Sequence, residues 1–353
     1  MHIYILEQCH YEKLDHFITN CKAIVLAQHT LEWRNALLGM NTDKAYYIVA
    51  EEANEIVAYL PLFKFYSNRG NLLQSSPYPA SYGGIITDSD ERYKPKIFEA
   101  IFEFIFSNKP LMENVILFTI VTSPFTDDIA LYQNFFNYDY KKQNFFQYLD
   151  LENNDDKQKS KFRNNLRRNL RKAKANKFDI VFSENFEDTK KWYEIIQSRF
   201  LQKGIKPAPY DYYYSLTKNL FPAMKGLYIH LYKDATIVAS SLFFYNSNVE
   251  VDIFLRAVKP EFVKTQAGTY LDYLSIQYFK DKSYKYFNWQ SSPKMSSPSY
   301  EYKKAWGSNL DYHYYLTKKV NGFDNFFQLT KNELQNEYPN HYLMPFEEIQ
   351  YAA

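Results

Sequence analysis

The residues whose types and spacing could do chemistry gather in one stretch of the chain, from Val249 to Gly307. Its pattern predicts a strand, a helix that opens at a glycine, a second strand and a loop that ends in a lysine pair. These elements are expected at Val249–Ala257, Ala267–Lys280, Tyr284–Gln290 and, for the end of the loop, Tyr302–Gly307. Free N–H groups at a helix start hold anions, and lysines between aromatic residues can hold another. We therefore expect this stretch to bind an anionic cofactor or substrate.

The first of these strands carries carboxylates on one of its two faces. Strand side chains alternate, so Asp252 and Glu250 project away from the apolar side chains of Val251 and Ile253. An amine nucleophile arrives protonated and must lose a proton before it attacks. We expect Asp252 to be the base, with Glu250 in reserve. A solvated sheet face would show the same alternation, so both interpretations stay open.

Other catalytic patterns are missing from the sequence. The seven histidines are scattered and lack the spacing of zinc ligands. The sequence contains no H-E-x-x-H, G-x-S-x-G or P-loop motif. We therefore expect no metal cofactor.

Composition sets the class of protein that must position these residues. The chain has 353 residues, 46% of them hydrophobic and 23% charged, which suits a globular protein with two domains. A net charge of +2 excludes a global field directed at nucleic acid or membrane, so any basic site must be local. Two cysteines make no disulfide framework, and no leader or membrane-spanning run is apparent. We expect a cytoplasmic protein.

A basic helix separates the two halves of the chain. Residues 157–177 hold ten Lys or Arg and no acid, after a capping sequence at Asn153–Asp156. Apolar residues spaced as one helix stripe lie within this segment, namely Phe162, Leu166, Leu170 and Ala173. The helix is thus expected to dock by its apolar face. Its cations could contact tRNA or an anionic lipid head group at a peripheral membrane surface, or form a solvated face.

Four short motifs, in order along the chain, resemble those of one family. The segments Ser81–Ile85 (SYGGI), Asn165–Ala173 (NLRRNLRKA), Thr265–Leu271 (TQAGTYL) and Tyr302–Gly307 (YKKAWG) carry the resemblance. They resemble, respectively, a first-domain turn, the basic helix that opens the second domain, the helix start after the fourth strand, and the terminal block. The chain is therefore similar to the GNAT acyltransferase superfamily, and within it to Fem-type transferases and BioF2-like acetyltransferases.

The resemblance implies an α+β fold of two tandem GNAT-like domains, each a mixed, mainly antiparallel sheet flanked by helices. We expect the first domain at residues 1–151 and the donor-binding second domain at residues 152–320, opened by the basic helix 157–177. A C-terminal tail, residues 321–353, carries an expected helix at Phe323–Asn336. Such proteins transfer an acyl or aminoacyl group to an amine.

The same resemblance assigns residues to the donor. Backbone groups of Ile253, Phe254 and Leu255 would pair with the pantetheine arm of an acyl-CoA. The helix start would hold the donor's pyrophosphate, at Gln266, Ala267, Gly268 and Thr269. The common signature of the superfamily is Q/R-x-x-G-x-G/A, and here Ala267 stands at its first glycine position and Thr269 at its last. Fem-type enzymes also have a degraded signature, and they take aminoacyl-tRNA as donor.

Further roles follow beyond the second strand. Tyr302 and Tyr300 stand where GNAT proteins often place a proton donor, and a phenol with a pKa near 10 suits a thiolate leaving group. Lys303 and Lys304 are assigned to a phosphate of the acceptor or donor, although a surface lysine pair is the plainer interpretation. Trp289 and Tyr82 complete the expected acceptor-binding set.

Three functions are compatible with these residues. The first is an N-acyltransferase that uses acetyl-CoA or another acyl-CoA to modify an amine, such as an amino sugar or nucleotide-linked sugar in cell-envelope polysaccharide synthesis. The second is a Fem-type transferase that uses aminoacyl-tRNA and acts on a peptidoglycan precursor. The third is a non-catalytic GNAT-like binding protein. The acceptor and the oligomeric state do not follow from the sequence.

Overall fold

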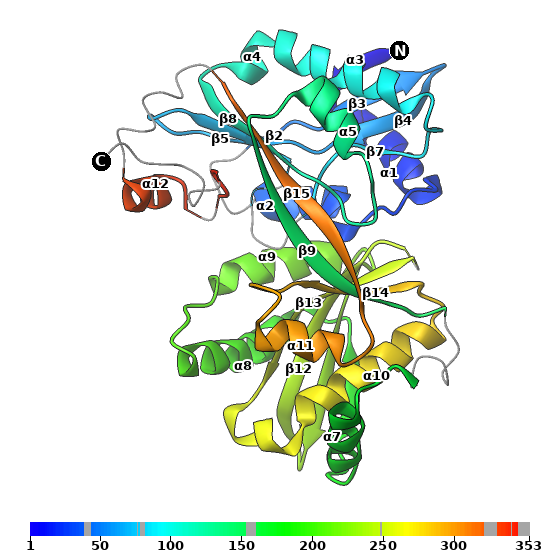
Figure 1. Ribbon diagram of the computed structural model, residues 1–353, viewed down its shortest axis with the longest axis vertical. Coiled ribbons are helices and arrows are strands. Elements are labelled where there is room, and N and C mark those ends of the chain that lie inside the picture. The colour runs from blue at the N-terminus through cyan, green and yellow to red at the C-terminus, as the bar shows by residue number, and fades with distance from the viewer. Residues whose placement is uncertain are drawn as a thin grey trace. The chain divides into compact units, whose positions relative to one another are not determined.

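The computed structural model describes residues 1–38, 44–75, 77, 82–152, 160–247, 249–320, 330–339 and 341–344. These residues form two compact units. The first is built from the described parts of Met1–Arg34, Asn41–Asn144 and Tyr312–Ala353, and the second from those of Asn35–Met40 and Phe145–Asp311. Both units combine a mainly antiparallel sheet with helices (Figure 1).

The second unit is organised around a sheet in the order β10-β11-β12-β13-β14-β9. Its strands are β10 (Asp179–Ser183), β11 (Gly226–Lys233), β12 (Thr236–Tyr245), β13 (Glu250–Val258), β14 (Tyr286–Ser291) and the end of β9 (Tyr140–Asp150). Neighbours are antiparallel except for β13 and β14, which are parallel. Parallel pairing joins Glu250–Asp252 to Tyr286–Asn288, and in the described structure the two strands are unpaired beyond Asp252. Backbone groups of β13 are therefore open beside this point.

Helices of the second unit pack on both sides of this sheet (Figure 1). They are α7 (Asn164–Lys174), α8 (Thr189–Gln202), α9 (Tyr210–Leu220), α10 (Ala267–Asp281) and α11 (Pro298–Lys304). Leu166 and Leu170 of α7 share one core with Leu271 and Ile276 of α10 and with Phe243 of β12. The apolar stripe expected for the basic helix thus docks it against α10.

The first unit contains two sheets, in the orders β1-β3-β4-β7 and β15-β8-β6-β5-β2. The strands are β1 (His2–Ile5), β2 (Lys44–Ala45), β3 (Ile48–Glu52), β4 (Glu55–Leu60), β5 (Phe63–Phe65), β6 (Asn71–Gln74), β7 (Ile86–Thr87), β8 (Val115–Val121) and β15 (Asn309–Lys319). The helices are α1 (Tyr11–Asn20), α2 (Leu31–Leu38), α3 (Lys94–Ser107), α4 (Lys109–Met112), α5 (Ile129–Leu131) and α12 (Lys331–Glu337). Helix α3 covers its sheet with aromatic and aliphatic side chains that meet Phe118 of β8.

The expected elements of Val249–Gly307 differ from the observed ones at one main point. β13, α10 and β14 lie within two residues of their expected bounds. The expected loop before Gly307 instead contains helix α11, so the prediction was wrong there. Ser297 caps this helix by accepting a hydrogen bond from the Tyr300 N–H, and Pro298 occupies its first position. That Ser-Pro pair is a helix-start signal that the sequence did contain.

The division of the chain also differs from the expected segments 1–151, 152–320 and 321–353. Residues 312–320 belong to the first unit, although they follow the second in sequence. The basic helix covers Asn164–Lys174, whereas its expected start at 153–159 lies outside the described residues. The tail helix covers Lys331–Glu337, and residues 323–329 of its expected range likewise lie outside the described residues.

Candidate active site

A pocket of about 210 Å³ opens at the N-terminal end of α10. Helix α8 and the residue after it, the end of β13, the segment that leads into α10, and α11 all contribute to its wall. The lining residues are Arg199, Phe200, Lys203, Arg256, Ala257, Val258, Val263, Gln266, Gly268, Thr269 and Tyr302. Three of them are cations and none is an acid. Burial and the charges of Arg199 and Arg256 lower the pKa of Lys203, so the cations act on one another and favour an anionic ligand.

The start of α10 is shaped by a backbone turn and by close packing. Gln266 takes the left-handed conformation with φ of 65°, and the helix begins at Ala267. A Cβ atom at Gly268 would lie 2.8 Å from Val258 Cγ2 and 3.2 Å from Arg256 Nη1. The missing side chain of Gly268 therefore makes room for two side chains of β13.

Arg256 ties β13 to α10 and α11 through a polar cluster in which Asp272 is buried and Arg256 and Tyr302 are half-buried. Its Nη1 donates to Asp272 Oδ2, to the Gly268 carbonyl at 3.0 Å and to Tyr302 Oη at 3.1 Å. The guanidinium lies 5.0 Å from the centre of the Tyr302 ring, and Tyr302 Oη donates to Asp272 Oδ2 at 2.5 Å. Burial raises the pKa of Asp272 to about 6, although Arg256 opposes the shift. Burial and Asp272 raise the pKa of Tyr302, which keeps the phenol protonated.

A second cluster lies where β13 and β14 separate. Asp252 is buried there and accepts a hydrogen bond from Gln290 Nε2. Gln290 has a φ of 62°, which is strained for a residue with a side chain, and its N–H donates to Asn288 Oδ1 at 2.8 Å. The register of β14 with β9 shifts between Asn288 and Ser291. This bulge turns backbone carbonyls away from the sheet.

Lys303 of α11 occupies the space beside that bulge. Its Nζ donates to the carbonyl oxygens of Gln290 at 3.0 Å and Ser291 at 2.7 Å. Burial lowers the pKa of Lys303 to about 7, while Asp252 raises it and Arg256 lowers it. An amine with such a pKa exchanges its proton near neutrality, which suits a general base or acid.

The remaining candidates for proton transfer lie elsewhere. Glu250 is buried, and burial together with the charge of Asp252 raises its pKa, which disfavours its charged form. The Tyr300 ring packs edge-on against Phe145 at 5.7 Å and carries Lys304 above it at 5.8 Å. Like Lys303, Asp252 and Glu250, neither Tyr300 nor Lys304 is among the residues that line the pocket.

The expected binding residues are only partly brought together. Gln266, Gly268 and Thr269 line the pocket, together with Tyr302. Ile253, Phe254 and Leu255 do not, because the pocket borders the next residues of β13. Ala267 is fully buried under the helix start.

The two aromatic residues assigned to the acceptor are both buried. Trp289 lies in the core, with its ring 4.8 Å from that of Phe287 and 5.8 Å from that of Trp306. Tyr82 belongs to the first unit, where its ring meets His313 at 5.1 Å. In this conformation neither presents a surface to an acceptor.

Sequence reasoning missed five residues of these clusters. They are Arg199, Lys203, Arg256, Asp272 and Gln290. One had a signal, because Asp272 lies one helical turn after Gly268. Alternation places Arg256 on the strand face of Asp252, but the register shift opposite Leu242 and Phe243 turns it to the face of Ile253, so that expectation was wrong. Arg199 and Lys203 come from α8, and no spacing pattern connects them to α10.

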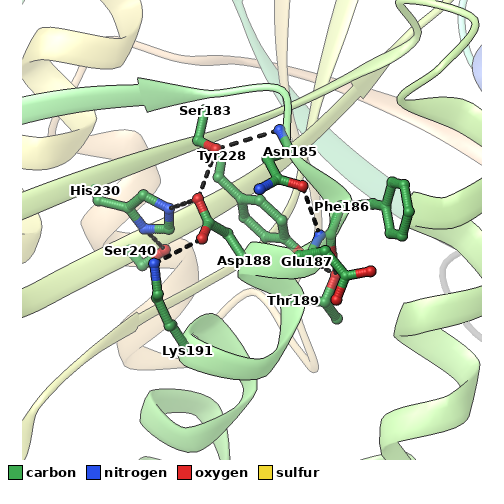
Figure 2. A network of polar contacts seen from close by, with 10 residues as sticks. All are labelled: Ser183, Asn185, Phe186, Glu187, Asp188, Thr189, Lys191, Tyr228, His230 and Ser240. Carbon is green, nitrogen blue, oxygen red and sulfur yellow. Dashed lines mark hydrogen bonds and ion pairs between the residues drawn. The ribbon is translucent and has the colours of Figure 1, made fainter.

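A Ser-His-Asp arrangement also occurs in the second unit (Figure 2). His230 Nδ1 lies 2.8 Å from Ser240 Oγ, and its Nε2 lies 3.8 Å from Asp188 Oδ2. Asp188 also accepts from Ser183 Oγ at 2.6 Å and Lys191 Nζ at 2.9 Å. His230 and Ser240 are buried, so no substrate reaches the hydroxyl. The network fastens the start of α8 to β11 and β12.

Comparisons with known proteins agree with this architecture. Residues 160–304 match the family model described as an acetyltransferase (GNAT) domain. The structure of FemX aligns with a TM-score of 0.71 at 13% identity and covers 93% of this chain and 99% of that one. No curated protein sequence matches. In the described residues no helix is long and apolar enough to cross a membrane.

Two further solved structures share the fold. L-PGS from Bacillus licheniformis aligns with a TM-score of 0.53 at 14% identity, covering 92% of this chain and 95% of that one. A tandem GNAT protein from the clavulanic acid biosynthesis pathway aligns at 0.50 and 12% identity, covering 90% and 98%. The expected fold of tandem GNAT-like domains is thus confirmed. Residues 160–304 are thus similar to the acetyltransferase (GNAT) domain family, and over its length the chain shares the fold of FemX.

Proposed function

We propose that this protein is a Fem-type transferase that moves an aminoacyl group from an aminoacyl-tRNA to the amine of a peptidoglycan precursor. The observation that carries the proposal is the position of Arg256. Its guanidinium and the Val258 side chain fill the space in front of Gly268. A coenzyme A diphosphate seated on the free N–H groups of the first turn of α10 would lie beside these two side chains, which narrow the approach to the helix start.

The charge of the pocket supports a phosphodiester donor. Three cations line the pocket: Arg199 of α8, Lys203 just after α8, and Arg256 of β13. The 3′ end of a tRNA presents single phosphates next to nucleosides, and Arg recognises phosphate oxygens through its fork of N–H groups. The likeness to FemX across the chain points the same way.

In this proposal Lys303 is the general base. A neutral amine keeps both N–H bonds for the carbonyls of Gln290 and Ser291, and its lone pair takes a proton from the acceptor's ammonium. The freed nitrogen attacks the ester carbonyl, the C–N bond forms, and the C–O bond to the ribose breaks. The attacking nitrogen loses its second proton as it becomes an amide, and the departing ribose oxygen takes up one proton. An amide and a tRNA with a free hydroxyl are released, and Lys303 gives its proton to solvent. Asp252 stabilises the Lys303 cation between these steps.

A second candidate is an N-acyltransferase that uses acyl-CoA, acting on an amino sugar or nucleotide-linked sugar. It is favoured by the matched family, which is described as an acetyltransferase domain, and by the α10 start at the pocket. Arg256 would then have to move away from Gly268 when the donor binds.

A donor comparison tests the proposal. The melting temperature of the protein is measured with a 3′-aminoacyl nucleotide, with the same nucleotide lacking its aminoacyl group, and with acetyl-CoA. Selective stabilisation by the aminoacyl form supports aminoacyl transfer. Stabilisation by acetyl-CoA alone would replace the proposal with the second candidate, and binding of neither donor would favour a non-catalytic binding protein.

A further inference from the structure

A basic groove runs beside the donor pocket, along α7. It has a volume of about 510 Å³, with Arg167, Arg171 and Lys174 as its cations and Phe162 and Tyr273 as aromatic walls. We call these three cations and Tyr273 the α7 basic surface. The mechanism proposed above does not use it.

The charge of this surface is concentrated and exposed. Residues 161–177 contain eight Lys or Arg and no acid, although the whole chain carries only +2. In the described structure Arg163 pairs with Glu301, whereas Arg171 has no acidic partner. Arg167, Arg171 and Lys174 are exposed and follow one another along one side of the helix. Along the helix axis, Arg171 lies about 6 Å and Lys174 about 10 Å from Arg167. A row of cations at that spacing fits successive phosphates of a strand.

The apolar residues of α7 argue against a membrane as the occupant. Leu166, Leu170 and Ala173 are buried against the second unit, and no large apolar side chain projects from the described part of α7. A helix that inserts into lipid needs a free apolar face. Instead, the ring of Tyr273 lies 5.2 Å from Lys174 Nζ, and an aromatic ring beside a cation is typical of sites where nucleic-acid bases stack.

The groove continues the donor pocket along α10. Thr269 lines the pocket, and Tyr273, one helical turn later, lines the groove. Asn176, just after α7, donates from Nδ2 to the Thr265 carbonyl at 3.4 Å, which anchors the end of the basic segment at the α10 start. A polyanion whose end enters the pocket therefore meets α7 next.

We infer that the α7 basic surface binds the phosphodiester backbone of an RNA. Identifying that RNA as the tRNA donor rests on the proposed function, whereas the binding itself does not. The cations hold phosphates, and Tyr273 offers a face for a base.

The test is salt-dependent binding of uncharged tRNA to the full chain. The triple variant Arg167→Glu, Arg171→Glu, Lys174→Glu is compared with a matched control, Lys190→Glu, Lys282→Glu, Lys294→Glu, whose lysines are exposed elsewhere in the second unit. We expect the α7 variant to bind about tenfold or more weakly, with the slope of log K against log salt reduced by about 2 to 3. The control should differ by much less. Glutamine versions of the same triple, checked by circular dichroism, exclude misfolding as the cause.

The possible outcomes separate the inference from the proposed function. If both triple variants lose tRNA affinity equally, or if the α7 triple variant loses none, the α7 basic surface is not an RNA-binding site. Stronger, α7-dependent binding to phosphatidylglycerol vesicles than to tRNA would replace RNA with a membrane. The 3′-aminoacyl nucleotide is too short to reach the α7 basic surface, so its binding tests the pocket alone. If the α7 triple variant still binds this nucleotide, the proposed function is supported even when the inference about the surface is wrong.

Discussion

At the scale of single residues, the protein places an ionisable amine where two strands part. Lys303 is held by two carbonyls that the β14 bulge turns toward it, and Asp252 lies near enough to raise its pKa. A sequence block of two lysines does not distinguish them. Here Lys303 turns inward, whereas Lys304 stays exposed over Tyr300.

The rate of acyl transfer should rise with pH through about 7. A base must be unprotonated to act, and the pKa of Lys303 is lowered to about 7. We expect Lys303→Arg, which stays charged, to lose about 100-fold or more in kcat, while Lys304→Arg stays near wild type. A single-turnover pH profile measures both. A rate that falls with rising pH would show that the ammonium acts instead, as a hydrogen-bond donor.

Replacing Asp252 should shift the pH dependence of the single-turnover rate, in addition to lowering the rate. The charge of Asp252 raises the pKa of Lys303, so Asp252→Asn should shift the midpoint of the rising limb to lower pH. The same variant should reduce turnover more than donor affinity. Titration of the single-turnover rate checks the shift, with Glu301→Gln as an exposed control. An unchanged midpoint would show that Asp252 does not affect the pKa of the base.

At the scale of elements, the site depends on how tightly α10 approaches β13. Gly268 faces Val258 and Arg256, and Arg256 continues to Asp272 and Tyr302. The strand, the helix start and α11 are thus fixed to one another by packing and by one guanidinium. Such closeness explains why a glycine stands at this position even though the surrounding signature is degraded.

Adding a methyl group to Gly268 should therefore destabilise the second unit. A Cβ atom 2.8 Å from Val258 Cγ2 forces that side chain to shift, so Gly268→Ala should lower the free energy of unfolding by about 1–3 kcal/mol. Urea unfolding measures the change, and Val258→Ala in the same chain should recover part of it. Gly268→Trp should in addition abolish donor binding. A neutral Gly268→Ala variant would contradict the close packing described here.

At the scale of the whole molecule, buried histidines make the folding stability of both units depend on pH. Burial lowers the pKa of His29 to about 3 and those of His230, His313 and His341 to about 4. Because the unfolded chain takes up protons near 6.5, stability should fall as pH drops from about 6.5 toward 4. Buried carboxyls such as Asp272, whose pKa is raised, oppose this trend.

His29 offers the cleanest measurement of that linkage. It is fully buried, and its Nδ1 accepts from the Leu26 N–H at 3.2 Å. We expect His29→Gln to reduce the slope of unfolding free energy against pH by about 1.4 kcal/mol per pH unit between pH 4 and 6. Urea unfolding at several pH values gives the slope for each protein. Equal slopes for variant and wild type would mean that His29 is protonated in the folded state.

Local patterns in the sequence were enough to predict much of this molecule. Alternation located β13, helical spacing located α7 and α10, and the order of four motifs predicted the tandem GNAT-like fold. Such signals succeed because strands and helices repeat within a few residues, so the pattern lies in one short segment.

Only the tertiary structure decided how the candidate site is assembled. It brings Arg199 and Lys203 to the start of α10, sets Arg256 against Gly268, and turns Lys303 toward the β14 bulge. Each of these contacts joins residues on different elements, and Gln290 adopts a left-handed backbone that its residue type does not favour. Periodicity contains no information about such contacts, because they depend on which elements pack together. The sequence therefore determined the elements and their family resemblance, and packing determined which charged groups meet.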